Sequence, residues 1–381
     1  MKIAKIDQFF PHPRMRLVKI TTDDGIVGWG EATLEGKPKS TMAAVEELAE
    51  YLIGKDPLRI EHHWQHIYRS AFFRGGNVLM SALSGIDHAL WDIAGKYHGV
   101  PVYRLLGGPT RDRVRVYAHW GIREPGTAAR EAAEERLAYL RGAGGFDAFK
   151  SGPTGTWRAH EPPARIDEFI ACAQQMRELV GPDTELAFDF HGKMTPALAI
   201  EVCHELRGVR PMFVEEPVPQ DNVDALKLVA DHVPFPIATG ERLLSRWEFR
   251  PLFEQGACAY IQPDVAHAGG ISEMKRIANM AEVYYVHIMP HCAIGPVALT
   301  ACLHVDAAVP NFLIQELVGP DRLFPDLVQT AWTIVDGHIT LPTVPGLGIE
   351  VDEREAARMT VYTEELGGEW YHPSDNSVAD W

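Results

Sequence analysis

The sequence has few cysteines, and their arrangement does not suggest a disulfide framework. Five cysteines occur among 381 residues, at widely separated positions and never as a Cys-x-x-Cys pair. Disulfide-rich secreted domains and structural zinc sites usually need cysteines at close, paired spacing. We therefore expect free thiols in a cytoplasmic protein, with neither a disulfide scaffold nor a zinc knuckle.

Basic residues are also fewer than acidic ones. Lysine and arginine total 36 against 52 aspartates and glutamates, which gives a formal net charge of −16 with histidine neutral. Such a surface repels polyanions, so we expect no nucleic acid partner. The chain is nevertheless 46% hydrophobic and 23% charged, a composition typical of a folded globular protein rather than a disordered one.

Long uninterrupted hydrophobic runs are absent. The most apolar stretch, 283–303, contains His287, Pro290, His291 and Pro296, so it is too broken to read as a membrane-spanning helix. The first residues alternate apolar and polar side chains and show no apolar core followed by a cleavage site. We therefore expect no membrane partner and no secretion signal.

The first 120 residues have the pattern of a small α+β domain. Apolar runs at 17–21 and 26–31 flank Asp24-Gly25, a dipeptide typical of a hairpin turn. We expect this hairpin to open the domain. Helical periodicity follows at 42–52 and 81–98, where apolar residues recur on one face. We predict that residues 1–120 form an α+β capping domain that serves as a lid over a substrate site.

Beyond the capping domain, short apolar runs alternate with helical stretches about every 25 residues. Eight units of this size predict a (β/α)8-type barrel over 121–381, with the C-terminal segment packing back on the capping domain. A doubly wound open sheet is the competing fold, although no G-x-G-x-x-G follows a strand to support it. The expected strands are 114–119, 146–150, 186–191, 212–215, 236–240, 258–263, 286–290 and 312–315.

Ionisable residues stand at the ends of most of these strands. In a barrel the carboxyl ends of all strands meet at one mouth, so these residues would converge on one cavity. Asp189 and His191, two positions apart on one expected strand, would point the same way. The alternative is a set of separate charges where strands meet solvent. The series comprises Lys150, Asp189 with His191, Glu215, Glu241, Asp264, His291 and Glu316.

Three of these carboxylates, Asp189, Glu215 and Glu241, cannot meet as neighbouring anions unless their pKa values rise or a cation joins them. An all-oxygen ligand set favours Mg²⁺ and leaves Mn²⁺ open. The alternative is that Glu216 or Glu241 pairs with Arg242 at the rim. We therefore expect a magnesium site.

Two histidines in the series suggest proton transfer. His291 and Asp264 would be adjacent around the barrel, and a carboxylate that accepts from one imidazole nitrogen makes the other a better base. His191 stands three or four strands away, close to the expected metal site, where it could donate a proton from another direction. The alternative for each histidine is a buried structural role.

Several ordered motifs together resemble the enolase superfamily, mandelate racemase branch. Within that branch they are most similar to the D-galactonate dehydratases, and the resemblance runs from the first strand to the last residues. The motifs are residues 84–96, Phe188-Asp189-Phe190-His191-Gly192, Val214-Glu215-Glu216-Pro217, Thr239-Gly240-Glu241-Arg242, residues 262–270, Pro290-His291-Cys292 and residues 375–381.

The resemblance implies a role for each site residue. Asp189, Glu215 and Glu241 would be the magnesium ligands, and His291, assisted by Asp264, would remove the proton at C2 of a sugar acid. His191 would protonate the departing 3-hydroxyl, and Glu316 would hydrogen-bond the substrate carboxylate as an enediolate forms. The product would be a 2-keto-3-deoxy acid. The resemblance also implies a homo-oligomer, commonly an octamer.

Substrate recognition is less well defined by the sequence. Lys150 would contact the substrate or a ligand carboxylate, and its motif lacks the second lysine that would favour a racemase. Arg14 and Arg74, on loops of the capping domain, are further candidate substrate contacts, and the loop 153–163 could alter recognition. Other aldonates such as arabinonate, gluconate or fuconate stay open as substrates. An epimerase and a non-catalytic sugar-acid-binding barrel are the remaining alternatives.

Overall fold

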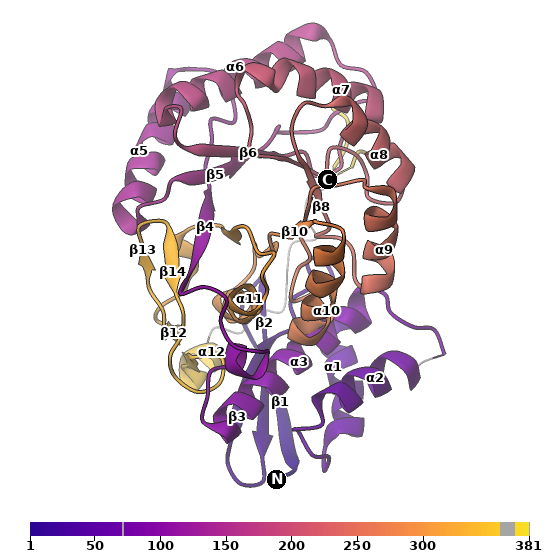
Figure 1. Ribbon diagram of the computed structural model, residues 1–381, viewed down its shortest axis with the longest axis vertical. Helices are drawn as coiled ribbons and strands as arrows, with labels where there is room; N and C mark the ends of the chain where they lie inside the picture. The colour runs from indigo at the N-terminus through magenta and orange to yellow at the C-terminus, as the bar shows by residue number, and fades with distance from the viewer. Residues whose placement is uncertain (71, 359–369, 381) are drawn as a thin grey trace.

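The computed structural model describes residues 1–70, 72–358 and 370–380, and it divides into a capping domain and a barrel (Figure 1). The capping domain is built on an antiparallel sheet in the order β1-β2-β3. Its strands are β1 (Ile3–His12), β2 (Met15–Thr22) and β3 (Val27–Glu31). The expected hairpin is β2-β3, but β1 precedes it and pairs antiparallel with β2, so the hairpin that opens the domain is β1-β2.

Four helices complete the capping domain, and the longest of them packs directly on the sheet. This helix, α3, ends at Gly99, which takes a left-handed conformation typical of a helix C-terminus. Glycines allow its close approach to β3, because a Cβ on Gly30 would overlap the Gly85 carbonyl. The helices are α1 (Pro38–Leu52), α2 (Ile60–Ser70), α3 (Asn77–His98) and α4 (Val102–Leu105).

Eight parallel strands form a closed barrel, which confirms the predicted fold class and excludes the open sheet. Strands β4 to β10 pair in sequence order, β11 pairs with β4, and an isolated bridge between Ile288 and Phe312 joins the last two strands. The strands are β4 (Arg113–His119), β5 (Ala148–Ser151), β6 (Glu185–Asp189), β7 (Val214–Glu215), β8 (Ile237–Thr239), β9 (Tyr260–Ile261), β10 (His287–Ile288) and β11 (Gln315–Leu317). Because β4 belongs to the barrel, the boundary expected at residue 120 falls after the first barrel strand, and the chain changes domain between α4 and β4.

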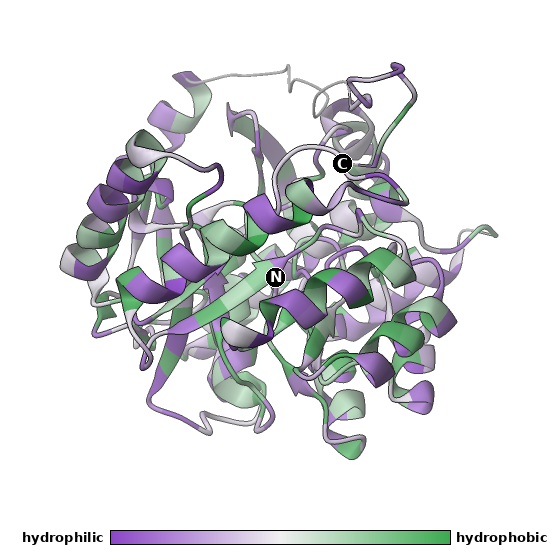
Figure 2. Cartoon of the chain, turned by 90° about the horizontal axis from the view of Figure 1, so that it is seen from above, coloured by the Kyte–Doolittle hydropathy of each residue, from purple (hydrophilic) through white to green (hydrophobic). Residues whose placement is uncertain are grey.

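The barrel helices surround the strands (Figure 1) and begin at recognisable signals. Asn222 caps α8 by accepting from the Ala225 amide at 3.1 Å, and proline occupies the first turn of α6, α7 and α11. Hydrophilic and hydrophobic residues alternate along these helices (Figure 2), as expected for helices with one buried face. They are α5 (Thr127–Gly144), α6 (Pro163–Val180), α7 (Pro196–Glu205) with a 3-10 turn η1 (Leu206–Gly208), α8 (Val223–His232), α9 (Arg246–Gln255), α10 (Gly270–Val283) and α11 (Pro296–Ala308).

After β11 the described chain forms short strands in place of a further long barrel helix. Strand β14 pairs antiparallel with β4, and α12 contacts β1 of the capping domain. Lys19 Nζ of the neighbouring strand β2 lies 2.6 Å from Glu353 Oε1 of α12. Farther on, Asp375 lies 3.1 Å from Arg158 of the loop 153–163. The elements are η2 (Pro320–Arg322), β12 (Val328–Thr330), β13 (Ile334–Val335), β14 (His338–Thr340), β15 (Ile349–Val351) and α12 (Glu353–Arg358).

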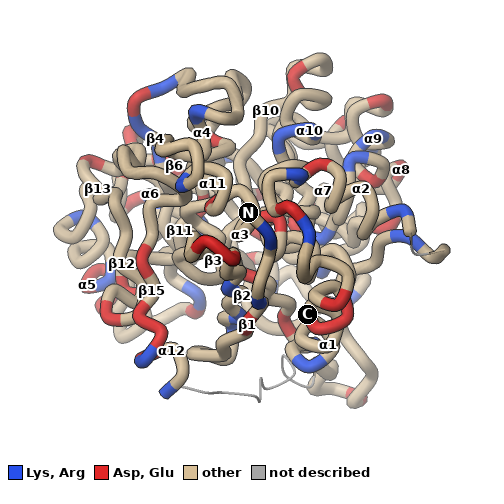
Figure 3. Tube along the Cα trace, turned by 90° about the horizontal axis from the view of Figure 1, so that it is seen from below, with Lys and Arg blue, Asp and Glu red and all other residues tan. Residues whose placement is uncertain are grey.

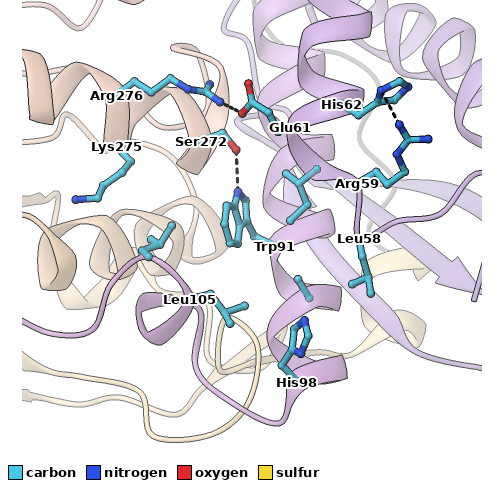
Figure 4. Close-up of a pocket in the computed structure, with 13 residues that line it drawn as sticks. Leu58, Arg59, Glu61, His62, Trp91, His98, Leu105, Ser272, Lys275 and Arg276 are labelled. Carbon is cyan, nitrogen blue, oxygen red and sulfur yellow. Dashed lines mark hydrogen bonds and ion pairs between the residues drawn. The ribbon is translucent and has the colours of Figure 1, made fainter.

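Buried hydrogen bonds fix the capping domain to the barrel. Trp64 Nε1 donates to the Gly269 carbonyl at 2.8 Å, and Asp87 accepts from the Ser272 amide at 3.0 Å and from its hydroxyl at 2.6 Å. Trp91 also reaches Ser272 across a groove between the two domains (Figure 4). These bonds hold α3 on α10.

Surface and membrane features agree with a folded globular chain. Acidic and basic residues are both scattered along the chain (Figure 3). All five cysteines are free and buried. Among the helices of residues 1–70, 72–358 and 370–380, none has both the length and the apolar character that a membrane crossing requires.

Candidate active site

The carboxyl ends of the barrel strands and the loops of the capping domain enclose a cavity of about 590 Å³. Its wall carries most of the ionisable residues that the sequence singled out, together with several that it did not. The lining residues are Arg14, Leu34, Glu35, Asn77, His119, Lys150, Asp189, His191, Gln220, Glu241, Arg242, Leu244, His267, His291, Ala293 and Glu316.

Three carboxylates meet at one side of this cavity. Asp189 and Glu215 are the last residues of β6 and β7, and Glu241 follows β8 by two residues. One oxygen from each lies within 4.8 Å of the others. The alternative was that Glu216 or Glu241 pairs with Arg242 at the rim. Only Glu216 does so, and Glu241 faces the cavity.

The donor set fits a hard divalent cation. All three groups offer oxygen, and Glu215 is fully buried with one oxygen, Oε1, lacking any hydrogen-bond partner. Burial, and then the charge of Asp189, raise the pKa of Glu215 well above its ordinary value. A Mg²⁺ ion on these oxygens would satisfy the orphaned atom and relieve the repulsion.

Lys150 is the protein's own positive charge beside the carboxylate triad. The side chain, on β5, is almost fully buried, and its Nζ lies 3.2 Å from Asp189, 2.8 Å from Glu215 and 2.6 Å from Glu316. Burial alone would raise the pKa of Glu316, but the Lys150 and His291 charges overcome burial and hold it well below its ordinary value. Lys150 therefore compensates both the triad and Glu316.

His291 and Asp264 form the expected pair. Each follows its strand by three residues, and an isolated parallel bridge aligns their backbones. His291 Nδ1 lies 2.6 Å from Asp264 Oδ2, while Nε2 faces the cavity at 3.2 Å from Glu241. Burial opposes protonation of His291, but Glu316 and Glu241 prevail and raise its pKa well above the ordinary value. The pair has the geometry of an oriented imidazole base.

His191 contacts the carboxylate triad at Asp189, although not for the reason that strand alternation gave. Strand β6 ends at Asp189, and His191 stands in a turn with a positive φ of 50°. The turn returns the ring toward the strand end, where Nε2 lies 3.0 Å from Asp189 Oδ2. The two histidines thus flank the triad, one beside Asp189 and the other beside Glu241.

Other sequence expectations need correction. Glu316 lies inside β11, not after it, and its Oε2 accepts from the Cys292 amide at 2.8 Å. Arg14 lines the cavity, whereas Arg74 is exposed and does not. The loop 153–163 contributes nothing to the lining; its Arg158 instead contacts Asp375.

Sequence reasoning missed several residues of the cavity. His119 ends β4 and lies 2.6 Å from Glu316, so its strand-end position was an available signal. His267 lies within a quoted motif but carried no role. Glu35 and Gln220 lie on loops, where no periodicity pointed to them.

Comparison with known proteins agrees with this geometry. Residues 128–356 match the family model for the enolase C-terminal domain-like family, and residues 11–107 match that for the mandelate racemase/muconate lactonizing enzyme N-terminal domain. Over 100% of both chains, the sequence is 41% identical to a D-galactonate dehydratase from Xanthomonas euvesicatoria pv. vesicatoria and 40% identical to one from Ralstonia pickettii.

Solved structures of the same architecture cover the whole chain. A mandelate racemase/muconate lactonizing enzyme from Sulfitobacter sp. superposes with a TM-score of 0.90 at 35% identity over 100% of both chains. An enolase from Agrobacterium radiobacter, a candidate galactarate dehydratase bound to Na and L-malate, gives a TM-score of 0.90 at 33% identity, also over 100% of both chains. The chain therefore belongs to the mandelate racemase/muconate lactonizing enzyme family of the enolase superfamily.

Proposed function

We propose that this chain is a Mg²⁺-dependent hydro-lyase that dehydrates a sugar acid, D-galactonate first among the aldonates, to a 2-keto-3-deoxy acid. The observation that carries the proposal is the pair of histidines that contact different members of one carboxylate triad, His191 at Asp189 and His291 at Glu241. The full-length D-galactonate dehydratase relatives support the same reaction. Dehydration needs a base at C2 and an acid at the C3 hydroxyl, and two flanking imidazoles suit that task.

Asp189, Glu215 and Glu241 would hold the metal ion, which would lower the energy of the charge that develops on the substrate carboxylate. His291 Nε2 takes the C2 proton while Asp264 fixes the tautomer through Nδ1. Lys150 contacts the substrate carboxylate as the enediolate forms, and Glu316 holds the Lys150 ammonium in place through their 2.6 Å ion pair. His191 gives its proton to the 3-hydroxyl, which leaves as water, and the enol then tautomerises to the 2-keto acid.

The wider setting is also a proposal. The buried, unpaired cysteines support a reducing compartment such as the cytoplasm. We propose a homo-oligomer, of which the octamer is the form that the resemblance implies, and a small-molecule sugar acid as the binding partner. Light scattering of the purified protein measures the first of these directly.

The test is turnover of a panel of aldonates with Mg²⁺, in which semicarbazide absorbance reports the 2-keto acid. D-Galactonate, arabinonate, gluconate and fuconate form the panel, and chelation by EDTA should abolish product. Glu215→Gln should be inactive, whereas the matched surface variant Glu254→Gln, whose parent residue pairs with Arg250 outside the cavity, should be active. If no aldonate is dehydrated under these conditions, the proposed function is wrong.

A further inference from the structure

The capping domain forms the part of the cavity wall that faces the far end of a bound sugar acid. Arg14, Leu34 and Glu35 come from its loops and Asn77 from the start of α3, whereas the carboxylate triad and Lys150 come from the carboxyl ends of the barrel strands. A substrate whose carboxylate is held at the strand ends can extend its carbon chain toward the capping loops, because these loops form part of the cavity wall. In that orientation its last carbon meets residues of the capping domain.

Glu35 is the acidic group on that side, and an arginine and a histidine converge on it. Arg14 Nη2 lies 2.7 Å from Glu35 Oε1, and His267 Nε2 lies 3.4 Å from Oε2. Ser81 holds the His267 ring by a 3.0 Å hydrogen bond at Nδ1. Glu35 thus already occupies Arg14 and His267, the two side chains that could otherwise bind an anionic ligand.

The other cations of the cavity are also engaged. Arg242 pairs with Glu216, and Lys150 contacts three carboxylates at the strand ends. Among the described residues that line the cavity, every lysine and arginine therefore has a carboxylate partner. One ligand carboxylate can bind beside the metal ligands and Lys150. At the far end of the cavity no lysine or arginine of the described lining is left without a carboxylate partner to bind a second ligand carboxylate.

We infer that Glu35 makes this cavity selective for sugar acids with one carboxylate and against those with two. A terminal carboxylate would lie beside the Glu35 carboxylate and compete with it for Arg14, and like charges placed together are strongly disfavoured. A terminal hydroxymethyl group carries no charge and can hydrogen-bond to Glu35 or Arg14. This inference rests on the proposed function, because it assumes that a sugar acid occupies the cavity.

D-Galactonate and galactarate are the matched pair that tests this selectivity. They share the same chain of hydroxyl groups and differ only at C6, which is a hydroxymethyl group in one and a carboxylate in the other. The ratio of their kcat/KM values should strongly favour D-galactonate in the parent protein. Glu35→Gln keeps the shape and removes the charge, so it should shift this ratio toward galactarate by about tenfold.

Three variants separate this role from a general disturbance. Glu35→Asp keeps the charge and should keep the parent preference, and Glu254→Gln should leave the ratio unchanged. Arg14→Gln added to Glu35→Gln should cancel the shift of the kcat/KM ratio toward galactarate, because Arg14 is the cation that Glu35→Gln releases. A shift toward galactarate that persists without Arg14 would contradict the inference.

Binding gives a readout that does not depend on turnover. In a His291→Asn background, which removes the proposed base, calorimetry with Mg²⁺ measures the dissociation constants of both acids, with and without Glu35→Gln. We expect tighter binding of D-galactonate and a shift of about tenfold toward galactarate in the double variant. Equal affinity for the two acids, an unchanged ratio, or no binding of either would overturn the inference. Selective binding without any turnover by the parent protein would instead support the inference and refute the proposed dehydratase.

Discussion

Replacing Lys150 by methionine should destabilise the metal-free protein and should do so only where its carboxylate neighbours are ionised. Lys150 is the only lysine or arginine of the described chain within ion-pair distance of the triad. Removing one partner of a buried ion pair costs about 3–5 kcal/mol. Because Glu215 can take up a proton in response, we expect the lower end, about 3 kcal/mol in the free energy of unfolding at pH 7.5.

The pH dependence identifies the cause. The folded pKa of Glu316 lies well below its ordinary value of 4.5, so its pairing with Lys150 stabilises the fold above pH 4.5. That stabilisation is lost as the pH falls through the folded pKa of Glu316, so the difference in unfolding free energy between the parent and Lys150→Met should decrease in strong acid. Saturating Mg²⁺ at pH 7.5 should also decrease this difference, because the ion supplies the missing positive charge.

Urea unfolding of EDTA-treated proteins at several pH values measures these differences. Lys227→Met is the control, since Lys227 is a helix-surface residue paired with Asp231 and its loss should change stability little. If Lys150→Met were as stable as the parent at pH 7.5, or if the loss were the same at every pH, the compensating role of Lys150 would be refuted.

The remaining predictions concern the base, a buried carboxylate and the domain packing. His291→Asn should lower kcat by about 10²–10⁴ and abolish exchange of the C2 proton with D₂O, whereas His191→Asn should block dehydration but retain exchange, as followed by NMR. Burial raises the pKa of Glu31 to about 7 from 4.5, so the folded state should lose about 3 kcal/mol between pH 4.5 and 7 from this group alone, a slope that Glu31→Gln should remove in unfolding measurements. Gly30→Ala should destabilise the protein by about 2 kcal/mol in thermal melts, because its Cβ would overlap the Gly85 carbonyl.

Each of these has a contrary result. Exchange that persists in His291→Asn but disappears in His191→Asn would reverse the assigned base and acid. A pH slope that is identical in Glu31→Gln and the parent would mean that Glu31 does not take up a proton on folding. A Gly30→Ala protein with parental stability would show that β3 and α3 can move apart at no cost.

The barrel was predictable because its signal is repetitive and local. Each strand is a short apolar run at a regular distance from the next, and tertiary packing only had to place those runs side by side. The same repeat placed Asp189, Glu215 and His291 at one mouth without any knowledge of the structure. Strand ends were less accurate, since β7, β9 and β10 are each only two residues long.

Local rules failed where the backbone leaves regular geometry. Alternation along a strand places His191 and Asp189 on one face, but the strand stops at Asp189 and His191 itself takes a left-handed conformation in the turn that follows. The contact is present, yet it depends on the turn. No helical or strand period covers such a residue, so its direction follows only from the tertiary structure.

The wall formed by the capping domain was the least predictable part of the site. Arg14 and Arg74 looked equivalent as loop arginines, but only Arg14 reaches the cavity. Glu35 had no signal at all, because its importance comes from meeting Arg14 and His267 across two domains. His119 could have been found, since it ends a strand as the other site residues do.

The most direct test of the account is a crystal structure with Mn²⁺ in place of Mg²⁺, examined by anomalous scattering. We predict a single strong peak between the carboxylates of Asp189, Glu215 and Glu241, on the side open to His291. A map without a peak at that position, or with the ion held by other residues, would contradict the claim that these three side chains bind the catalytic metal.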